Sequence, residues 1–239
     1  MIKLQTITGI ELSNLCNLKC SYCINKDIVK SSVRDVGLMS DDTFNATTII
    51  IEQLVKRGTQ QEIWMNGNGE SLLDLQVVNR VQIVKRIVGN LQVGISTNGF
   101  LMSDEIAAGL KAAGIDRVDI SSHVLDAAIQ AQRICMKNGI KAGISTGVIF
   151  SNHNWAGQVD NLKPNPNLSN VTCKPLLEGR GYVQKEGSIS PCCYDYRNLG
   201  AFGTVFDADI LDRVIKPFEL CETCHQQIPA IIKEYYKGK

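Results

Sequence analysis

Short apolar stretches alternate with longer amphipathic segments along the first two thirds of the chain. The apolar stretches have the length of β-strands and run from Ile7 to Leu12, Glu62 to Asn66, Leu91 to Thr97, Arg117 to Ser121 and Ile140 to Phe150. The amphipathic segments between them predict four helices: one from Ser40 that stops at Gly58, one from Leu72 to Val88, one from Ser103 that stops at Gly114, and one from Asp126 to Lys137. Regular strand-helix alternation with short connections predicts right-handed crossovers and a parallel sheet.

The number of these units indicates an incomplete barrel. Five or six strand-helix units are too few for eight strands, whereas an open partial (β/α)6 TIM-like barrel fits the length. From Asn154 to Asn170 the chain is rich in Pro and Asn without periodicity, which predicts a linker with a short helix near Trp155. We therefore expect a barrel domain at residues 1–160 and a small C-terminal domain at residues 161–239.

The C-terminal part is not expected to be stable without a source of cohesion besides its own hydrophobic core. Val171 to Lys239 reads as short strands or turns followed by a terminal helix, and it is too small to bury a core alone. A bound metal cluster would supply the missing cohesion.

Composition and charge exclude some classes of function. The 239 residues include 25 basic and 24 acidic ones, a net charge of +1, so the chain shows no polyanion-binding signal and nucleic acid is not indicated as a partner. The chain starts without a charged segment followed by an apolar run, and no stretch reaches the roughly 18 apolar residues of a membrane span. We expect a cytoplasmic protein without a membrane partner.

The nine cysteines fall into groups. Cys16, Cys20 and Cys23 form the first group, Cys135 stands alone within a predicted helix, and the last third holds Cys173, Cys192, Cys193, Cys221 and Cys224. The odd count argues against a disulfide framework. Two groups of thiols are typical of a metalloprotein with two centres, while Cys135 reads as a core residue.

The first group has an informative spacing. Three thiols separated by three and then two residues can cap three irons of a 4Fe-4S cluster and leave the fourth iron open for a chelating molecule. A structural zinc site prefers four ligands in closely spaced pairs and fits poorly. This stretch, Cys16-Asn-Leu-Lys-Cys20-Ser-Tyr22-Cys23, resembles the signature of the radical S-adenosylmethionine (radical SAM) superfamily, with Tyr22 as the aromatic residue before the last cysteine.

The resemblance extends to the next predicted strand. Gly67-Asn68-Gly69-Glu70 is similar to the Gly-Gly-Glu element that takes the methionyl amino group of S-adenosylmethionine in that family, and Asn68 departs from its commonest form. A glycine permits close approach of the backbone, and a carboxylate pairs with an ammonium group. The alternative is a glycine-rich turn with a surface Glu.

Other strand ends match the family more weakly. The resemblance implies cosubstrate-binding roles for Ser96, Thr97 and Asn98 at ribose and carboxylate, for Ser121 and His123 facing substrate or cosubstrate, and for Gly143 and Gly147 at adenine. Taken singly, each has an ordinary alternative as a turn former, a structural histidine or a strand glycine. Together they lie on successive strand ends, where barrels of this type collect their active sites.

The late cysteines resemble an auxiliary-cluster extension. Gly187-Ser-Ile-Ser-Pro-Cys-Cys and Phe202-Gly-Thr-Val-Phe are similar to the extension called SPASM in its full form and twitch in its shortened form. The resemblance implies a second 4Fe-4S cluster on Cys173, Cys192, Cys221 and Cys224, for which an all-cysteine zinc site is the alternative. Cys193 is then spare, as a hydrogen donor, a substitute ligand or a residue without a role.

The implied activity is reductive cleavage of S-adenosylmethionine to a 5'-deoxyadenosyl radical that abstracts a substrate hydrogen. An auxiliary cluster can accept an electron, which favours dehydrogenation of a small polar substrate, with an aminocyclitol alcohol as the family precedent. The expected partners are a small-molecule or peptide substrate and an electron donor such as flavodoxin or ferredoxin. The alternatives are redox-neutral epimerisation, isomerisation or cross-linking of a peptide, another polymer or a nucleobase, and, outside enzymes, an iron-sulfur electron carrier or a zinc-stabilised binding module. A separate leader-peptide-binding domain is not expected.

Overall fold

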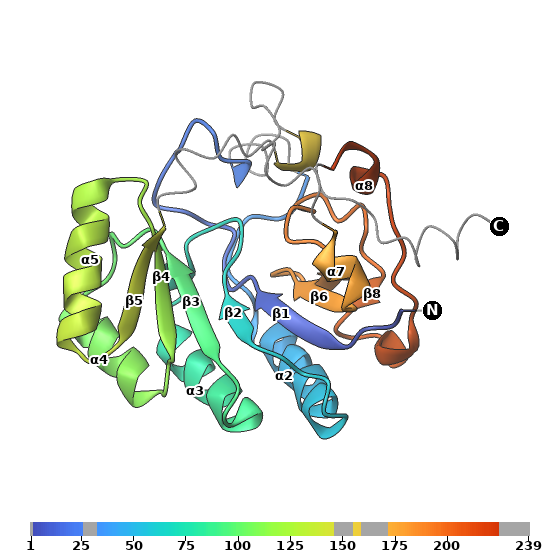
Figure 1. Ribbon diagram of the computed structural model, residues 1–239, viewed down its shortest axis with the longest axis horizontal. Coiled ribbons are helices and arrows are strands. Elements are labelled where there is room, and N and C mark those ends of the chain that lie inside the picture. Colours follow the sequence, from blue (N-terminus) through green and yellow to red (C-terminus); the bar gives the residue numbers. More distant parts are fainter. Residues whose placement is uncertain (1, 26–32, 146–154, 159–171, 225–239) are drawn as a thin grey trace.

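The computed structural model describes residues 2–25, 33–145, 155–158 and 172–224. Its centre is a single eight-stranded sheet in the order β5-β4-β3-β2-β1-β6-β7-β8. Neighbouring strands from β5 through to β6 run parallel, and β7 and β8 are antiparallel. Helices cover the outer side of the parallel strands, and the loops after the carboxyl ends of the strands gather at the opposite end of the molecule (Figure 1).

The first five strands confirm the predicted alternation. They are β1 (Thr6–Ile10), β2 (Ile63–Met65), β3 (Val93–Thr97), β4 (Arg117–Ser121) and β5 (Lys141–Ser145). The helices between them are α2 (Asp41–Lys56), α3 (Val77–Val88), α4 (Asp104–Ala112) and α5 (Leu125–Lys137). The open parallel sheet with its outer helices is the α/β partial barrel expected from the sequence pattern.

The helix ends follow the predicted capping. The Ser40 side chain accepts from the Thr43 backbone N–H at the start of α2, and Ser103 accepts from Ile106 at the start of α4. Gly58 and Gly114 follow α2 and α4 with φ of 72° and 87°, a left-handed conformation that favours glycine. The ends of these two helices could therefore be predicted from single glycine residues in the sequence.

One helix begins later than predicted. The segment predicted as a helix from Leu72 contains a 3-10 turn, η1 (Ser71–Leu73), a break, and only then α3 (Val77–Val88). At the break the Asp74 side chain accepts from the Gln76 backbone N–H at 2.9 Å and faces Arg80 Nε at 3.0 Å. Asp74 is only 3% exposed, so this local bonding competes with the helix and delays its start.

The C-terminal segment adds to the same sheet. It contains α7 (Lys174–Leu177), β6 (Arg180–Val183), β7 (Ser188–Ser190), β8 (Gly203–Thr204), η4 (Ile210–Asp212) and α8 (Leu220–Thr223). The sixth parallel strand, β6, pairs with β1 and not with β5. A short turn, η2 (Trp155–Gly157), lies where a helix was expected near Trp155, but Trp155 and Ala156 have left-handed φ values of 50° and 58°, so it is not an ordinary helix. The predicted boundary between residues 160 and 161 lies outside the described residues.

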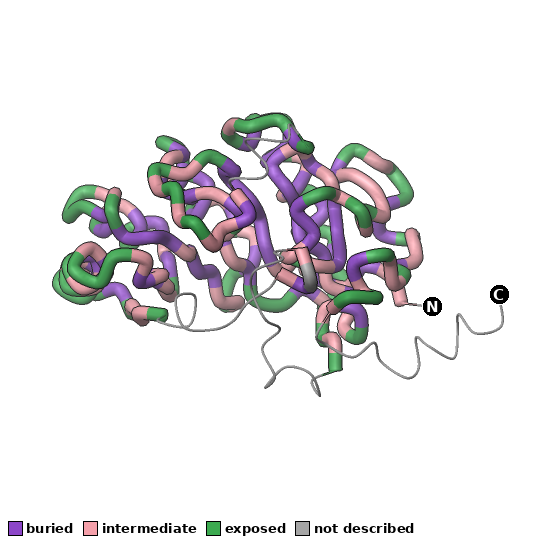
Figure 2. Tube along the Cα trace, turned by 90° about the horizontal axis from the view of Figure 1, so that it is seen from above, coloured by how far each residue is buried: buried purple, intermediate pink, exposed green. Residues whose placement is uncertain are grey.

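The two parts share one hydrophobic core. Val183, Ile189 and Leu211 of the C-terminal segment belong to the same buried cluster as Ile7 and Ile10 of β1. Buried residues line the strands through the middle of the molecule when it is seen from above (Figure 2). The C-terminal segment therefore gains cohesion by packing on β1, in addition to whatever a bound metal contributes.

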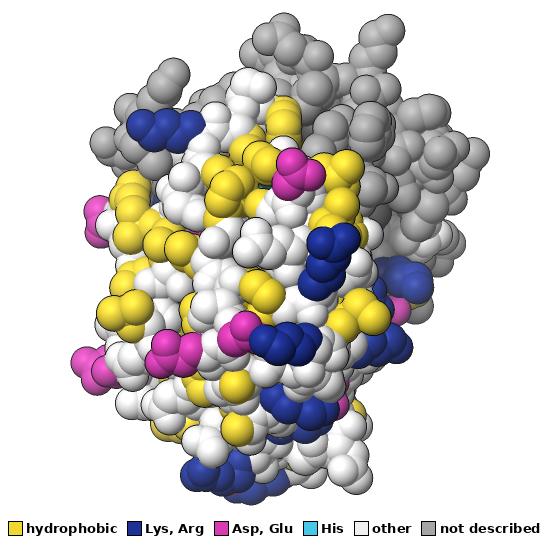
Figure 3. Space-filling view, turned by 90° about the vertical axis from the view of Figure 1, so that its left-hand side faces the viewer, with side chains coloured by type: hydrophobic (Ala, Val, Ile, Leu, Met, Phe, Trp, Pro, Cys, Tyr) yellow, Lys and Arg dark blue, Asp and Glu magenta, His cyan; other side chains and the backbone are white. Residues whose placement is uncertain are grey.

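The surface has mixed character. On the face that carries α4 and α5, hydrophobic side chains are interspersed with both basic and acidic ones (Figure 3). Leu125 and Met136 of α5 are 57% and 63% exposed. This side of the molecule shows no field of a single sign among its described residues, in keeping with the net charge of +1.

Within the described ranges, no helix combines the length and apolar character needed to cross a lipid bilayer.

Two isoleucines of α2 offer a matched test of the core. Ile51 is 0% exposed and Ile49 is 56% exposed. We expect Ile51→Ala to lower the free energy of unfolding by about 2–5 kcal/mol, because it leaves a cavity in the shared core, and Ile49→Ala to lower it by less than about 1 kcal/mol. Urea unfolding of both variants checks this, and equal losses would place the core elsewhere.

Candidate active site

The three early thiols lie on one loop after β1. Cys16, Cys20 and Cys23 are all half-buried, and the Cys23 backbone N–H donates to the Cys20 carbonyl at 3.1 Å. The backbone N–H groups of Leu18 and Asn25 point at the Cys16 and Cys23 sulfurs, each at 3.4 Å. Such donors stabilise thiolates and tune the potential of an iron-sulfur cluster, so the loop fits a three-thiolate cluster.

The loop forms one wall of a cavity of about 710 Å³, a size typical of sites for small cofactors. Its lining includes the early thiols and the predicted residues Tyr22, Gly69, Glu70, Ser96, Thr97, Asn98, Ser121 and His123. The carboxyl ends of β2, β3 and β4 supply most of these side chains, as expected for parallel strands that end at one edge. The fold thus brings together most of the residues predicted from separate strand ends.

Glu70 is a buried residue in the wall of this cavity. It is 2% exposed, and its carboxylate accepts from the Leu72 N–H at 3.0 Å, the Thr97 hydroxyl at 2.8 Å and the Asn98 N–H at 2.7 Å. Burial raises the pKa of Glu70, and these three hydrogen bonds oppose the rise. The alternative of a surface Glu on a glycine-rich turn is therefore wrong.

Gly69 permits the close packing of the turn that carries Glu70. A Cβ atom on Gly69 would lie 2.3 Å from the Leu15 carbonyl oxygen and 2.5 Å from that of Ser13. The Glu70 backbone N–H donates to the Leu15 carbonyl at 2.7 Å. Only glycine allows the turn to lie directly on the backbone that leads into the cysteine loop.

Asn98 connects the end of β3 to the same loop. Its side-chain amide donates to Asn17 Oδ1 at 2.7 Å and approaches the Cys16 sulfur at 3.9 Å. Burial raises the pKa of the Cys16 thiol; the Leu18 N–H opposes the rise, and the nearby Glu70 adds to it. The thiol is consequently protonated at neutral pH, and metal binding has to displace its proton.

Tyr22 and His123 form a pair in the cavity wall. The Tyr22 hydroxyl lies 2.6 Å from His123 Nδ1, and the ring centroids are 5.9 Å apart. Burial, with a contribution from Cys20, raises the pKa of Tyr22 to about 12, while burial lowers the pKa of His123. Both side chains are neutral at pH 7, and the pair presents hydrogen-bonding groups without charge.

The two predicted adenine-binding glycines have different outcomes. Gly143 lies within β5 opposite Asp119, and it is not among the described residues that line the cavity. A Cβ atom there would meet only the Asp119 and Arg117 side chains, at 3.4 and 3.5 Å, so nothing about its packing demands glycine. Gly147 lies outside the described residues.

The late thiols are neighbours of one another. Burial raises the pKa of Cys173, Cys192 and Cys221, and in each case the charge of Cys224 raises it further. Cys193 is exposed beside them. The four predicted ligands are therefore grouped in space.

Asp195 organises the loop that carries Cys192. It is fully buried and accepts from the Ser190 hydroxyl at 2.7 Å and from the Leu199 and Gly200 N–H groups at 2.9 and 2.8 Å. In the parts of the chain that the structure describes, no three Cys, His, Asp or Glu side chains converge closely enough to share a single metal ion.

Sequence reasoning missed Trp155 as a cavity residue. Its ring lines the cavity and packs edge-to-face on Tyr194, with centroids 5.7 Å apart and an interplanar angle of 84°. Tyr194 directly follows Cys192 and Cys193 in the sequence, so Trp155 contacts both the cavity and the segment that carries two of the late thiols. Trp155 stands in an aperiodic stretch, so only its aromatic side chain signalled a site.

The His123 environment predicts a pH effect on stability. Its folded-state pKa lies below the ordinary value, so the unfolded chain binds more protons as pH falls through about 6.5. We expect the free energy of unfolding to decrease as pH falls below that value, and His123→Gln to weaken this decrease. Urea unfolding at pH 7.5 and 5.5 tests it; an unchanged slope, or an NMR midpoint of the imidazole above 6.5, would contradict it.

Comparisons with known proteins agree with this geometry. The model of the Radical SAM superfamily matches residues 10–154, which is more than half of the chain. The GTP 3',8-cyclase of Limosilactobacillus fermentum is 34% identical over 122 residues, which cover 50% of this chain and 34% of that protein. The chain thus matches only about a third of the length of this relative.

Two solved structures share the fold. BtrN in complex with AdoMet and 2-DOIA superposes with a TM-score of 0.68 at 21% identity, over 88% of this chain and 83% of that one. Native anSMEcpe with bound AdoMet gives a TM-score of 0.58 at 14% identity, over 92% of this chain and 86% of that one. These likenesses cover the barrel and reach into the C-terminal segment.

The matched model, together with three cysteines grouped on one loop after β1, establishes the family, which implies a 4Fe-4S cluster and S-adenosylmethionine as cofactors. This chain belongs to the radical SAM superfamily.

Proposed function

We propose that this protein is an enzyme that cleaves S-adenosylmethionine at a 4Fe-4S cluster held by Cys16, Cys20 and Cys23 and removes a hydrogen atom from its substrate. The observation that carries the proposal is the cavity in which the three thiols meet the carboxyl ends of β2, β3 and β4. When bound, the cluster and its cosubstrate supply the hydrogen-abstracting radical. The chain supplies binding, orientation and exclusion of water.

In this proposal Glu70 receives the amino group of the cosubstrate. Among the described residues its Oε2 accepts one hydrogen bond, from Asn98, and a carboxylate oxygen can accept a second. The bonds from Leu72 and Thr97 hold the other oxygen, so the carboxylate is preorganised before the ligand arrives.

The other cavity residues divide into polar and apolar ones. In this proposal Ser96, Thr97 and Asn98 donate or accept hydrogen bonds at the ribose and carboxylate of the cosubstrate, and Ser121 and His123 face substrate or cosubstrate; what supports it is that all five line the cavity. Leu15, Leu18, Val36 and Trp155 contribute apolar side chains to the same wall. A mostly apolar wall excludes water, which protects a reactive intermediate from side reactions. An adenine-binding role for Gly143 and Gly147 stays a prediction.

For the overall reaction we propose dehydrogenation of a small polar substrate. The late thiols, of which Cys192 contacts Tyr194, are proposed to hold a second 4Fe-4S cluster. Such a cluster would supply the acceptor for the electron that the substrate releases when its second hydrogen leaves as a proton. The fold likeness to BtrN, whose structure holds AdoMet and 2-DOIA, supports a small polar substrate. A flavodoxin- or ferredoxin-type donor would provide the electron for cosubstrate cleavage.

A redox-neutral reaction is the second candidate. It is supported by the 34% identity to a GTP 3',8-cyclase, whose name denotes a cyclisation of GTP. The matched segment covers half of this chain. The two candidates differ in the product, since oxidation removes two hydrogens and cyclisation or isomerisation leaves the mass unchanged.

The first test concerns the early thiols. We expect anaerobically reconstituted protein to release 5'-deoxyadenosine from S-adenosylmethionine under reducing conditions, and Cys16→Ala, Cys20→Ala and Cys23→Ala each to abolish release, because each variant loses a cluster ligand. Cys135→Ala is the matched control, since Cys135 is a buried cysteine of α5 outside the cavity. Continued cleavage in the first three variants would contradict the assignment.

The second test concerns the late thiols. We expect about eight irons per reconstituted chain and about four in the Cys221→Ala/Cys224→Ala variant, which should still release 5'-deoxyadenosine. With 2-DOIA as probe substrate, the parent protein should form a product lighter by two hydrogens and the variant should not. About four irons in the parent, or GTP-dependent release with a product of unchanged mass, would favour the redox-neutral candidate.

A further inference from the structure

A buried carboxylate contacts Asn68, one of the residues that line the cavity. Glu11, immediately after β1, is 0% exposed. Its Oε1 accepts from the backbone N–H of Asn68 at 3.0 Å and from the Asn68 side-chain amide at 2.9 Å. Its Oε2 accepts from the Lys185 N–H at 3.2 Å and from Arg34. One side chain thus receives donors from three separate segments.

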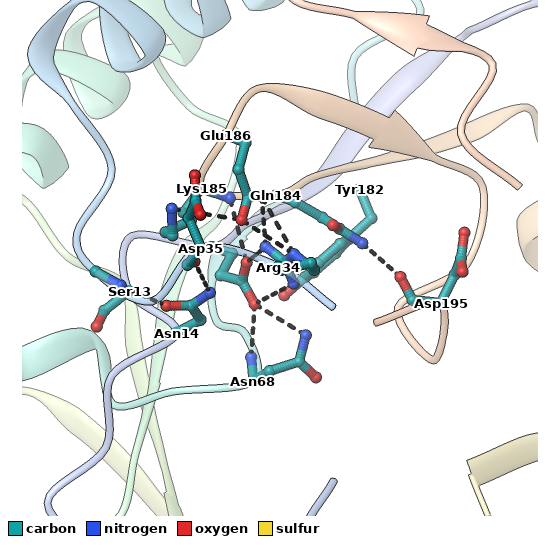
Figure 4. A network of polar contacts seen from close by, with 12 residues as sticks. Ser13, Asn14, Arg34, Asp35, Asn68, Tyr182, Gln184, Lys185, Glu186 and Asp195 are labelled. Carbon is teal, nitrogen blue, oxygen red and sulfur yellow. Dashed lines mark hydrogen bonds and ion pairs between the residues drawn. The ribbon is translucent and has the colours of Figure 1, made fainter. Parts of the chain in front are cut away.

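Arg34 holds this carboxylate from the other side. Its side chain is 2% exposed and also pairs with Glu186 at 2.7 Å. The Glu11 and Glu186 carboxylates keep the Arg34 pKa above its ordinary value against the effect of burial. Figure 4 shows Arg34 between Glu186 on the β6–β7 turn and Asn68 on the loop after β2. The pair is a fixed anchor because neither partner has access to water in which to reorient.

Asn68 continues from this anchor to the cysteine loop. Its carbonyl accepts from the Asn25 side-chain amide at 2.7 Å, and the same amide reaches the Asn14 carbonyl at 2.6 Å. The Asn25 backbone N–H in turn donates to the Cys23 sulfur at 3.4 Å. An unbroken series of hydrogen bonds therefore runs from Arg34 through Glu11, Asn68 and Asn25 to a cluster cysteine.

The departure from the common Gly-Gly-Glu form now has a physical reason. A glycine at position 68 would keep the backbone bond to Glu11 and lose the side-chain bond. A Cβ atom on the preceding Gly67 would lie 2.4 Å from Glu11 Cγ, so the turn already packs against this carboxylate. The amide of Asn68, which is 7% exposed, fills a buried position that requires a donor.

We infer that Asn68 is a positioning residue, which fixes the Gly67–Glu70 turn and the Cys23 end of the cysteine loop relative to each other by anchoring both to the buried Glu11–Arg34 pair. Its effect on cosubstrate binding rests on the proposed function. Its effect on the order of the two segments does not, since it follows from the hydrogen bonds alone.

Amide hydrogen exchange of the reconstituted protein, repeated without metal, tests the inference. Asn68→Ala removes the side-chain donor and keeps an ordinary backbone, because Asn68 has no left-handed φ. We expect exchange to accelerate about tenfold in two peptides at once, one spanning Gly67–Glu70 and one spanning Cys23 and Asn25. Asn25→Ala should accelerate the same two peptides from the opposite end of the series.

Gln60→Ala is the matched control. Gln60 is also 7% exposed, and its amide bonds to the backbone of Ile7 at the other end of β1, with distances of 2.8 and 3.1 Å. It should accelerate exchange around β1 and leave both site peptides unchanged. Unchanged exchange in Asn68→Ala, or acceleration confined to its own turn, would overturn the inference.

A second measurement separates this inference from the proposed function. In reconstituted protein, Asn68→Ala should raise the KM for S-adenosylmethionine about tenfold and leave both kcat and the iron content close to the parent values. A loss of kcat with unchanged KM would overturn the positioning role. If the parent protein released no 5'-deoxyadenosine, the proposed function would fail while the exchange result would still decide the role of Asn68.

Discussion

The site depends on the burial of one ion pair, Glu11 with Arg34. Removing two charges from water costs more than their attraction returns unless the remaining hydrogen-bonding capacity is also satisfied. Glu11 meets this condition with donors from Asn68 and Lys185, and Arg34 meets it with Glu186. The loops after β1, β2 and β6 must therefore converge on one point, and Gly67 and Asn68 of the β2 loop at this point also line the cavity.

A second buried carboxylate, Glu70, connects loops in the same way within the wall of the cavity. Glu70 collects donors from Leu72, Thr97 and Asn98, and so joins the turn after β2 to the end of β3. Both carboxylates accept hydrogen bonds from backbone N–H groups of these loops. The backbone of each loop is therefore fixed relative to the strand that precedes it. Cys16 lies next to Asn98 and Cys23 next to Asn25, so each end of the cysteine loop is held by an amide that belongs to this framework.

Local sequence signals predicted the parts of this molecule that depend on neighbours in the chain. Apolar runs located the five barrel strands, and Ser40 and Gly58 marked the ends of α2 because caps act within one turn. Pairings between distant segments were invisible to such signals. Arg34 stands in an aperiodic stretch, and its role appears only when Glu186, 152 residues away, is beside it. Likewise β6 gives no sign in its own residues that it pairs with β1. Besides Trp155, an overlooked local clue was Glu11, a charged residue inside a run predicted as an apolar strand.

Burial determines how a metal could bind at the late thiols. Burial raises the pKa of Cys221 to about 11 and that of Cys192 well above its ordinary value, so without metal these thiols are protonated at neutral pH. Any metal that binds must displace protons, and the affinity of the site must therefore increase with pH. The same requirement applies to the proposed 4Fe-4S cluster and to an all-cysteine zinc ion, because both bind thiolates.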